Sequence, residues 1–164
     1  MKRSEFKKLA EERIGTNGRY LFEKYNTKTH WCMMMVYDFM HDIAGISEFP
    51  KTFSCSGFKS TTFAKKRLNH DYKTAEIGDI ILFELNNNRA DGPDHVGIVL
   101  GNENGVITML EGNTNGHSDL YYDTSSVNRF MYSTNAACFE CIIDMSEFFT
   151  DDDEEEKTEV PQEN

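Results

Sequence analysis

The sequence predicts a single α+β domain. Helical periodicity is confined to about the first 70 residues, and short β-rich runs separated by Asn, Gly, Asp and Ser fill most of the rest. Segregated helices and strands favour an antiparallel sheet packed against helices over a parallel, doubly wound sheet. A chain of 164 residues can bury a core without disulfide or metal support. We expect this domain to occupy residues 1–149.

Each helix is predicted from its apolar spacing and its stop signal. Residues 4–14 carry apolar side chains at helical spacing and end at Gly15, and residues 19–25 form a shorter helical segment. Apolar residues surround the whole axis of residues 32–44, as expected of a helix buried at the centre of a domain. Residues 56–69 predict a further helix with a basic outer face.

The strands are predicted from short runs rich in β-branched and aromatic residues, bounded by turn residues. These runs are residues 79–85, 95–100, 106–112, 119–123, 127–132 and 138–144.

Charge and hydropathy exclude several classes of function. The net charge is −11, but residues 150–164 form an acidic segment that we expect to be a disordered tail, and residues 151–164 alone carry −7. The rest of the chain is nearly balanced and has no basic stripe, so we expect no nucleic-acid partner. No run of eighteen apolar residues predicts membrane insertion, and no apolar h-region predicts a signal peptide. We therefore expect synthesis in the cytoplasm.

Four cysteines raise the question of metal or disulfide chemistry. Without a signal peptide, free thiols are expected rather than disulfides. Cys138 and Cys141 form one CxxC pair with no second pair or neighbouring histidine, so the pattern favours a core strand over a zinc site. No metal and no cofactor are assigned.

Cys32 stands apart because it begins the buried helix, directly after the only tryptophan, Trp31. A free thiol titrates near about 8.5, and backbone N–H groups at a helix start favour the reactive thiolate. The same N–H groups can stabilise an oxyanion. Cys32 is therefore a candidate nucleophile, and a structural thiol is the alternative.

Among the five histidines, His95 is the best candidate base. It opens the run "HVGIVL", and Gly97 on the same face leaves room where a helix could approach. His41 lies too far along the central helix, and His30, His70 and His117 are expected in polar loops.

Residues 95–100 and 106–112 predict a hairpin whose register decides whether His95 has a carboxylate partner. If the loop "GNENG" is taken whole, His95 faces Glu111, close enough to fix the imidazole tautomer. A tight Asn104–Gly105 turn instead places Glu111 opposite Ile98, roughly 10 Å from His95. Asn113 is a second group that could orient the imidazole. Thiol, imidazole and carboxylate or amide together are the design of a papain-like cysteine hydrolase.

The ordered motifs also resemble a known family. "HWCMMMVYDFM", "AEIGDIILFELNNNRADGPDHVGIVLGNENGVITMLEGNTNG" and "VNRFMY...CFECIID" are similar to the CHAP domain, the cysteine- and histidine-dependent amidohydrolase/peptidase of phage endolysins and bacterial wall hydrolases. The resemblance implies a papain-like fold, with Cys32 as nucleophile, His95 as general base, Glu111 as orienting carboxylate and Asn113 as an additional polar partner. This sequence differs from the family pattern in the three methionines that follow Cys32, and we interpret them as core-packing residues.

The resemblance further implies cleavage of amide bonds in peptidoglycan, either between sugar and stem peptide or within the peptide and its cross-bridge. The expected protein is a phage or prophage lysin that reaches the wall through a holin or as a virion component, with other phage proteins as further candidate partners. Some members of the family bind calcium through an acidic loop, but "NNNRADGPD" lacks regular ligand spacing. Two alternatives remain: an intracellular cysteine amidase or peptidase acting on another small amide, and a catalytically silent structural or binding module of a phage particle.

Overall fold

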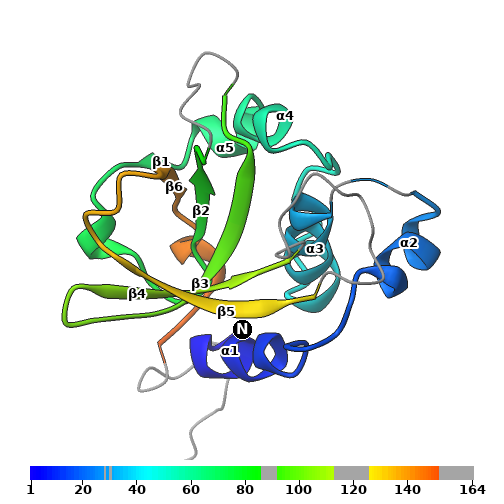
Figure 1. The fold of residues 1–164 in the computed structure, drawn as a ribbon, viewed down its shortest axis with the longest axis horizontal. Helices are drawn as coiled ribbons and strands as arrows, with labels where there is room; N and C mark the ends of the chain where they lie inside the picture. Colours follow the sequence, from blue (N-terminus) through cyan, green and yellow to red (C-terminus); the bar gives the residue numbers. More distant parts are fainter. Residues whose placement is uncertain (28, 30, 86–91, 113–125, 152–164) are drawn as a thin grey trace, which may run out of the picture.

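A computed structural model describes residues 1–27, 29, 31–85, 92–112 and 126–151. An antiparallel sheet forms the centre of the molecule, and helices pack around it (Figure 1). The helical elements are α1 (Arg3–Glu11), α2 (Arg19–Tyr25), α3 (Cys32–Tyr37), η1 (Asp38–Ile43), α4 (Cys55–Lys59), α5 (Thr62–Lys65), η2 (Tyr72–Thr74) and η4 (Ser146–Phe148). The strands are β1 (Leu68–Asn69), β2 (Ile80–Phe83), β3 (His95–Glu103), β4 (Val106–Glu111), β5 (Asn128–Ser133) and β6 (Phe139–Ile143).

The α+β class is confirmed, and the helices differ from prediction in detail. The central helix begins at Cys32 as predicted, but after Tyr37 it continues as the π-helix η1. The single helix expected over residues 56–69 is divided into α4 and α5, because Ser54 and Thr61 each accept a backbone hydrogen bond as an N-cap. Its last residues form the short strand β1, which the sequence did not predict.

The six strands lie in the order β1-β6-β2-β3-β4-β5, and each neighbouring pair is antiparallel. Five of the predicted runs coincide with β2 to β6, although β3 extends three residues beyond its predicted end and β5 one residue. The remaining one, residues 119–123, falls outside the described residues.

The two faces of the sheet bury separate apolar clusters. Helix α3 packs against β3 (Figure 1), and its residues 32–37 are all buried between the sheet and the outer helices. Met33, Met34 and Met35 are fully buried, so the three methionines serve core packing. The opposite face buries a second cluster that includes Phe83, Met109 and Phe139. Helix α3 therefore lies on the face of the sheet opposite the cluster of Phe83, Met109 and Phe139.

The β3–β4 hairpin differs from the predicted register. Asn104 and Gly105 form a two-residue turn with positive φ angles of 55° and 77°, so the five-residue loop was wrong. A bulge follows: Gly101 pairs with Thr108, but Val99 pairs with Met109, which leaves one extra residue, Leu100, on β3. The continued register places Glu111 opposite Gly97, and neither His95 nor Ile98 is its direct partner.

This bulge decides which face Glu111 occupies. A shift of one residue in strand pairing moves every side chain to the other face of the sheet. The tight turn alone would put Glu111 opposite Ile98, whereas the turn with the bulge puts it opposite Gly97, on the face that carries His95. Gly97 makes room for this carboxylate, since a Cβ there would lie 2.9 Å from Glu111 Cγ. The expectation that Gly97 admits a helix was therefore wrong.

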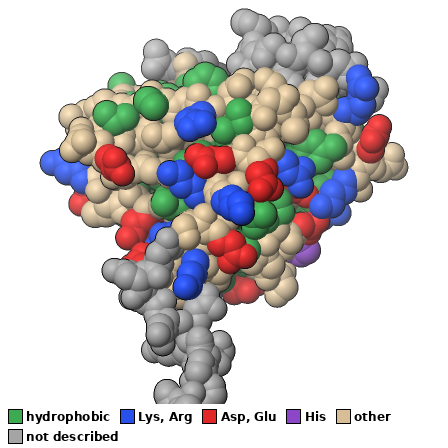
Figure 2. Space-filling model, turned by 90° about the horizontal axis from the view of Figure 1, so that it is seen from below, with side chains coloured by type: hydrophobic (Ala, Val, Ile, Leu, Met, Phe, Trp, Pro, Cys, Tyr) green, Lys and Arg blue, Asp and Glu red, His purple; other side chains and the backbone are tan. Residues whose placement is uncertain are grey.

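The surface seen from the α1 side carries Lys and Arg side chains interspersed with Asp and Glu (Figure 2). The side chains on this face form no continuous basic surface of the kind that binds nucleic acid. In the part of the chain that the structure describes, the helices are too short or too polar to cross a bilayer.

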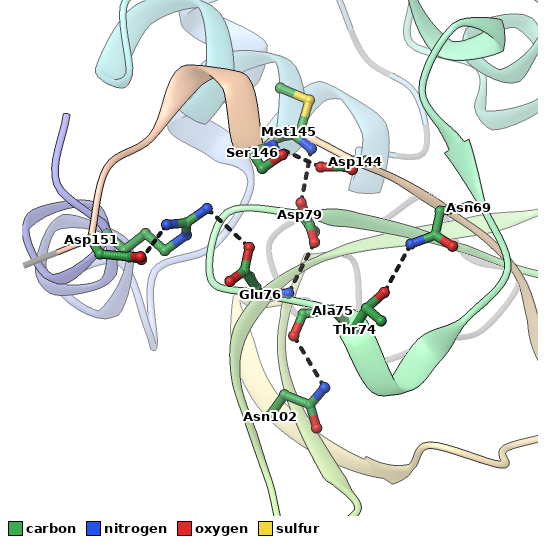
Figure 3. Close-up of polar contacts among 11 residues, drawn as sticks. Asn69, Thr74, Ala75, Glu76, Asp79, Asn102, Asp144, Met145, Ser146 and Asp151 are labelled. Atoms are coloured by element: carbon green, nitrogen blue, oxygen red, sulfur yellow. Dashed lines mark hydrogen bonds and ion pairs between the residues drawn. The ribbon is translucent and has the colours of Figure 1, made fainter.

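Buried Asp79, just before β2, connects three segments that are distant in sequence. Its carboxylate accepts hydrogen bonds from the backbone N–H groups of Glu76, at 2.9 Å, and Met145, at 2.8 Å (Figure 3). Its carbonyl accepts the N–H of Val99 on β3 at 2.8 Å. The carboxylate thereby connects the turn before β2 to the C-terminal segment.

The C-terminal segment also contacts the N-terminus. Thr150 exchanges backbone hydrogen bonds with Met1 and Arg3, and Arg3 forms ion pairs with Glu76 and Asp151. Thr150 and Asp151, which the sequence assigned to the tail, therefore pair with the domain. A disordered tail stays a prediction, because residues 152–164 fall outside the described residues.

Candidate active site

Cys32 occupies the first position of α3, and the residue before it fixes that helix start. The Trp31 ring is fully buried in a slot between two glycines: a Cβ on Gly18 would lie 2.6 Å from the ring, and one on Gly112 would lie 2.5 Å from it. Only residues without a side chain permit this approach. Trp31 thereby fixes the start of α3 beside Gly112, the residue after Glu111.

The imidazole of His95 is held by Glu111. His95 Nε2 lies 2.8 Å from Glu111 Oε1, and the two side chains are 12% and 4% exposed. The contact runs diagonally across the hairpin, from one end of β3 to a carboxylate that extends past Gly97. The His95 ring also packs on Phe83, at a centroid distance of 5.4 Å.

Glu111 has a second partner in the hydroxyl of Tyr132, which donates to Oε2 at 2.7 Å. Burial and the neighbouring Glu111 charge raise the pKa of Tyr132, so this hydroxyl keeps its proton and remains a donor. Each carboxylate oxygen is therefore engaged, one by His95 and one by Tyr132. This fixes the carboxylate and, through it, the imidazole ring.

Cys32, at the start of α3, and His95, at the start of β3, interact directly. Hydrogen bonds to Cys55 and His95, the His95 charge and the Met33 N–H together hold the pKa of Cys32 well below its usual range despite burial. Burial lowers the pKa of His95, but its hydrogen bonds and charge interactions with Cys32 and Glu111 outweigh burial and raise it to about 10. A thiolate–imidazolium pair is therefore the stable form at neutral pH.

A second thiol lies against the first. The Sγ atoms of Cys32 and Cys55 are 3.9 Å apart, and both residues are buried. The Cys32 thiolate and burial raise the pKa of Cys55 well above its usual range, so Cys55 stays protonated and donates its S–H to the Cys32 sulfur. Cys55 is the first residue of α4, whose N-cap is Ser54.

The CHAP domain family model matches residues 24–113, more than half of the chain. The chain belongs to the CHAP domain family. A search of curated proteins found no match. Among solved structures, the crystal structure of the wild-type endolysin LysIME-EF1 is similar, with a TM-score of 0.59 and 12% identity. The match covers 87% of this chain and 63% of the endolysin chain, so this CHAP domain spans less than two thirds of that protein.

The remaining site predictions for this CHAP domain have different outcomes. Asn113 falls outside the described residues, as do His30 and His117, so a role for Asn113 stays a prediction. His70 is exposed, and His41 pairs with Asp42 at 2.6 Å and stacks on Tyr37, away from Cys32.

The predictions about metals rest on the described residues alone. Within the described ranges, no three His, Cys, Asp or Glu side chains are grouped as metal ligands. Residues 86–91 of the acidic loop fall outside those ranges.

Cys141 is buried in the cluster beneath the helices, whereas Cys138 packs against the cluster on the other face. Cys141 therefore lies in a core strand, as predicted, whereas Cys138 lies in the turn just before that strand.

Two neighbours of the site were missed by sequence reasoning. Tyr132 on β5 pairs with Ile107 of β4, four residues before Glu111, yet its hydroxyl reaches the Glu111 carboxylate. Strand pairing alone does not predict this contact. Cys55 lies 23 residues from Cys32 in a separate helix, and a second cysteine near a candidate nucleophile was the only available signal.

Proposed function

We propose that this CHAP domain is a cysteine-dependent peptidoglycan hydrolase. The observation that carries the proposal is the convergence of Cys32, His95 and Glu111, which come from a helix start and from the two strands of one hairpin. The thiol and the imidazole interact directly, and Glu111 holds the imidazole at 2.8 Å. This is the arrangement that nucleophilic catalysis by cysteine requires.

The geometry supports a two-step acyl transfer. Because Glu111 engages Nε2 of His95, Nδ1 is the nitrogen that serves Cys32. The Cys32 thiolate attacks the amide carbonyl, and N–H groups of the first turn of α3 stabilise the oxyanion. His95 then gives its proton to the departing amine, and a water molecule activated by the neutral imidazole hydrolyses the thioester. Glu111 stabilises the imidazolium and holds its orientation.

Peptidoglycan is the proposed substrate because the family assignment and the likeness to an endolysin both favour a wall hydrolase. We propose an amide bond as the target, either the N-acetylmuramoyl-L-alanine bond of an amidase or a bond within the stem peptide or cross-bridge cut by an endopeptidase. We further propose that the protein acts as a phage or prophage lysin, which reaches the wall through a holin or as part of a virion.

The direct test compares the purified protein with Cys32→Ala on suspended bacterial walls. We expect the unaltered protein to lower the turbidity of the walls of a susceptible host, and we expect Cys32→Ala to lose essentially all of this activity. Mass spectrometry of the soluble products then identifies the bond. Free lactyl carboxylates on muramic acid together with free L-alanine amines indicate an amidase, and new termini within the peptides indicate an endopeptidase.

Cys141→Ala is the matched control, since Cys141 lies in the core strand β6 and its electrostatic neighbours, Lys59 and Glu140, are not residues of the site. It should retain the activity of the unaltered protein. Equal activity of Cys32→Ala and the unaltered protein would contradict the mechanism. Release of no new termini from any wall, together with cleavage of a soluble amide, would favour the intracellular amidase.

A further inference from the structure

The pairing of Cys32 with Cys55 has a chemical consequence beyond hydrolysis. The two sulfurs are 3.9 Å apart, and a disulfide requires about 2.05 Å, so the sulfurs must approach by about 1.9 Å. Rotation of a cysteine about its Cα–Cβ bond moves the sulfur by distances of this size without moving the backbone. The two residues begin separate helices, α3 and α4, so neither sulfur lies in the middle of a helix.

We propose that Cys32 and Cys55 form a reversible redox pair, in which a peroxide oxidises Cys32 and Cys55 closes a disulfide with it. This goes beyond hydrolysis, and only its effect on wall cleavage rests on the proposed function. The disulfide occupies the nucleophile and so stops the reaction until a thiol reductant restores it.

The chemistry balances in two steps. The Cys32 thiolate attacks one oxygen of hydrogen peroxide, the O–O bond breaks, and hydroxide leaves and takes up a proton, giving a sulfenic acid and water. The Cys55 thiol then loses its proton and attacks the Cys32 sulfur, the S–O bond breaks, and the departing hydroxide takes a proton to form a second water. Two thiols and one peroxide thus yield one disulfide and two waters.

The surroundings assign different roles to the two sulfurs. Cys32 is the thiolate, stabilised by His95 and by the Met33 N–H, and is therefore the sulfur that reacts with peroxide. Cys55 is kept protonated by its hydrogen bond to the Cys32 sulfur, by burial and by the charge on Cys32. Formation of the sulfenic acid removes that charge, which makes Cys55 easier to deprotonate at the moment when its thiolate is needed.

Other cysteines are poorly placed to compete. Cys141 is fully buried in β6, and burial raises its pKa to about 11. Cys138 packs on the opposite face of the sheet from α3. Cys32 is only 6% exposed, which disfavours a disulfide with another protein molecule. The intramolecular bond to Cys55 is therefore the expected product.

The test treats the full-length protein with a small excess of hydrogen peroxide and maps its cysteines by mass spectrometry. We expect the intact mass to fall by two hydrogen atoms and proteolysis to yield one linked peptide pair containing Cys32 and Cys55. Dithiothreitol should restore the original mass. Where wall cleavage is measurable, activity should be lost with the same time course and recovered with the reductant.

Cys55→Ser and Cys55→Ala remove the second sulfur, and Cys138→Ser is the matched control. In both Cys55 variants, Cys32 should proceed to the sulfinic acid, and dithiothreitol should not restore the thiol. Cys138→Ser should form the disulfide as the unaltered protein does. Two results would overturn the proposal: sulfinic acid at Cys32 in the unaltered protein with Cys55 still free, or a disulfide that links two molecules.

The mass measurement keeps this test separate from the proposed function. A reversible Cys32–Cys55 disulfide in a protein that cleaves no wall would uphold the redox pair and contradict the hydrolase. Wall cleavage by a protein that forms no such disulfide would uphold the hydrolase and contradict the redox pair.

Discussion

Hydrogen bonds from His95 and Tyr132 fix the Glu111 carboxylate, and His95 lies between this carboxylate and the Cys32 thiolate. Glu111 places one oxygen on His95 and the other on Tyr132, at 2.8 and 2.7 Å, so the carboxylate cannot rotate without losing a hydrogen bond. The fixed carboxylate engages Nε2 and leaves Nδ1 of His95 for Cys32. The raised pKa of His95, about 10, follows from its position between a thiolate and a carboxylate.

This arrangement predicts an unusual pH dependence for the reaction of Cys32 with iodoacetamide. An ordinary thiol with a pKa near 8.5 reacts a few hundredfold more slowly at pH 6 than at pH 9. Because the pKa of Cys32 is well below its usual range, we expect its rate to differ by less than about tenfold between these two pH values. Mass spectrometry of the alkylated peptides measures the rate for each cysteine.

The same experiment separates an active site from a silent module. Cys55→Ala removes the largest cause of the lowered pKa of Cys32, so alkylation of Cys32 should shift to higher pH in that variant.

Wall cleavage requires both the Cys32 thiolate and the His95 imidazolium. Its rate should therefore rise as pH passes the pKa of Cys32 and fall as pH passes about 10. Equal, slow alkylation of Cys32 and Cys141 near neutral pH would contradict this account.

Among individual residues, the sequence indicated those whose side chains are themselves reactive, and missed those that matter only because of where the fold places them. Cys32 and His95 could be selected because a cysteine at a helix start and a histidine at a strand start are recognisable patterns. Tyr132 could not be selected, because it pairs with Ile107, four residues from Glu111, and no local pattern indicates that its hydroxyl reaches that carboxylate. Their catalytic roles stay predictions, although the structure brings Cys32, His95 and Glu111 together.

Among the elements, the β3–β4 hairpin shows why a correct contact can follow from a wrong register. The sequence left two turns open, and only the five-residue loop placed His95 opposite Glu111. The tight turn formed instead, and the bulge at Leu100 shifted the pairing by one residue. Bulges are set by sheet bending and by packing on both faces, neither of which appears in a local pattern.

Gly97→Ala tests the importance of this register. Its Cβ would lie 2.9 Å from both Glu111 Cγ and Met109 Cε, and 3.1 Å from the Leu110 carbonyl oxygen, so Glu111 must move. We expect the free energy of unfolding to fall by about 1–3 kcal/mol through overpacking. Displacement of the carboxylate should lower kcat for wall cleavage on the order of 100-fold, with a smaller effect on KM.

Gly101→Ala is the control within the same strand, because the nearest atom to its Cβ would be Thr108 Cβ at 4.0 Å. It should retain kcat to within about threefold, since it leaves the positions of the reacting groups unchanged. If Gly97→Ala folded and kept full kcat, the proposed path from Gly97 to Glu111 to His95 would be wrong.

For the molecule as a whole, the sequence predicted the fold class because its two halves have different periodicities. The apolar residues around the axis of residues 32–44 predicted a buried helix. Residues 32–40 are buried, whereas residues 41–44 are half-buried or exposed. Strand β1 was missed because its two residues have no pattern of their own and pair with β6 across more than 70 positions. The contacts of Thr150 with Met1 and Arg3 likewise depend on chain ends meeting in three dimensions.

Asp79 is the residue through which we expect pH to act on the stability of the whole domain. It is buried between the turn before β2 and the C-terminal segment, with the carboxylates of Glu76 and Asp144 close by (Figure 3). Burial is the main cause that raises the pKa of Asp79 from 3.8 to about 6, and the two backbone N–H donors oppose it. The folded protein therefore holds a proton that the unfolded chain releases at lower pH.

Asp79→Asn should remove this pH dependence. In the unaltered protein the contribution of Asp79 is fully present below about pH 3.8 and is lost as pH rises through about 6, which amounts to roughly 3 kcal/mol. An asparagine at position 79 does not titrate. Its NH2 group replaces one of the two acceptor oxygens, so one backbone N–H group loses its hydrogen bond and the variant is less stable than the unaltered protein at low pH. Urea unfolding from pH 4 to pH 7 covers most of this change and should therefore show the stability difference moving in favour of Asp79→Asn by roughly 2 kcal/mol. Glu103→Gln, at the exposed end of β3, should run parallel to the unaltered protein. A constant difference between Asp79→Asn and the unaltered protein across this range would show that Asp79 is already ionised throughout.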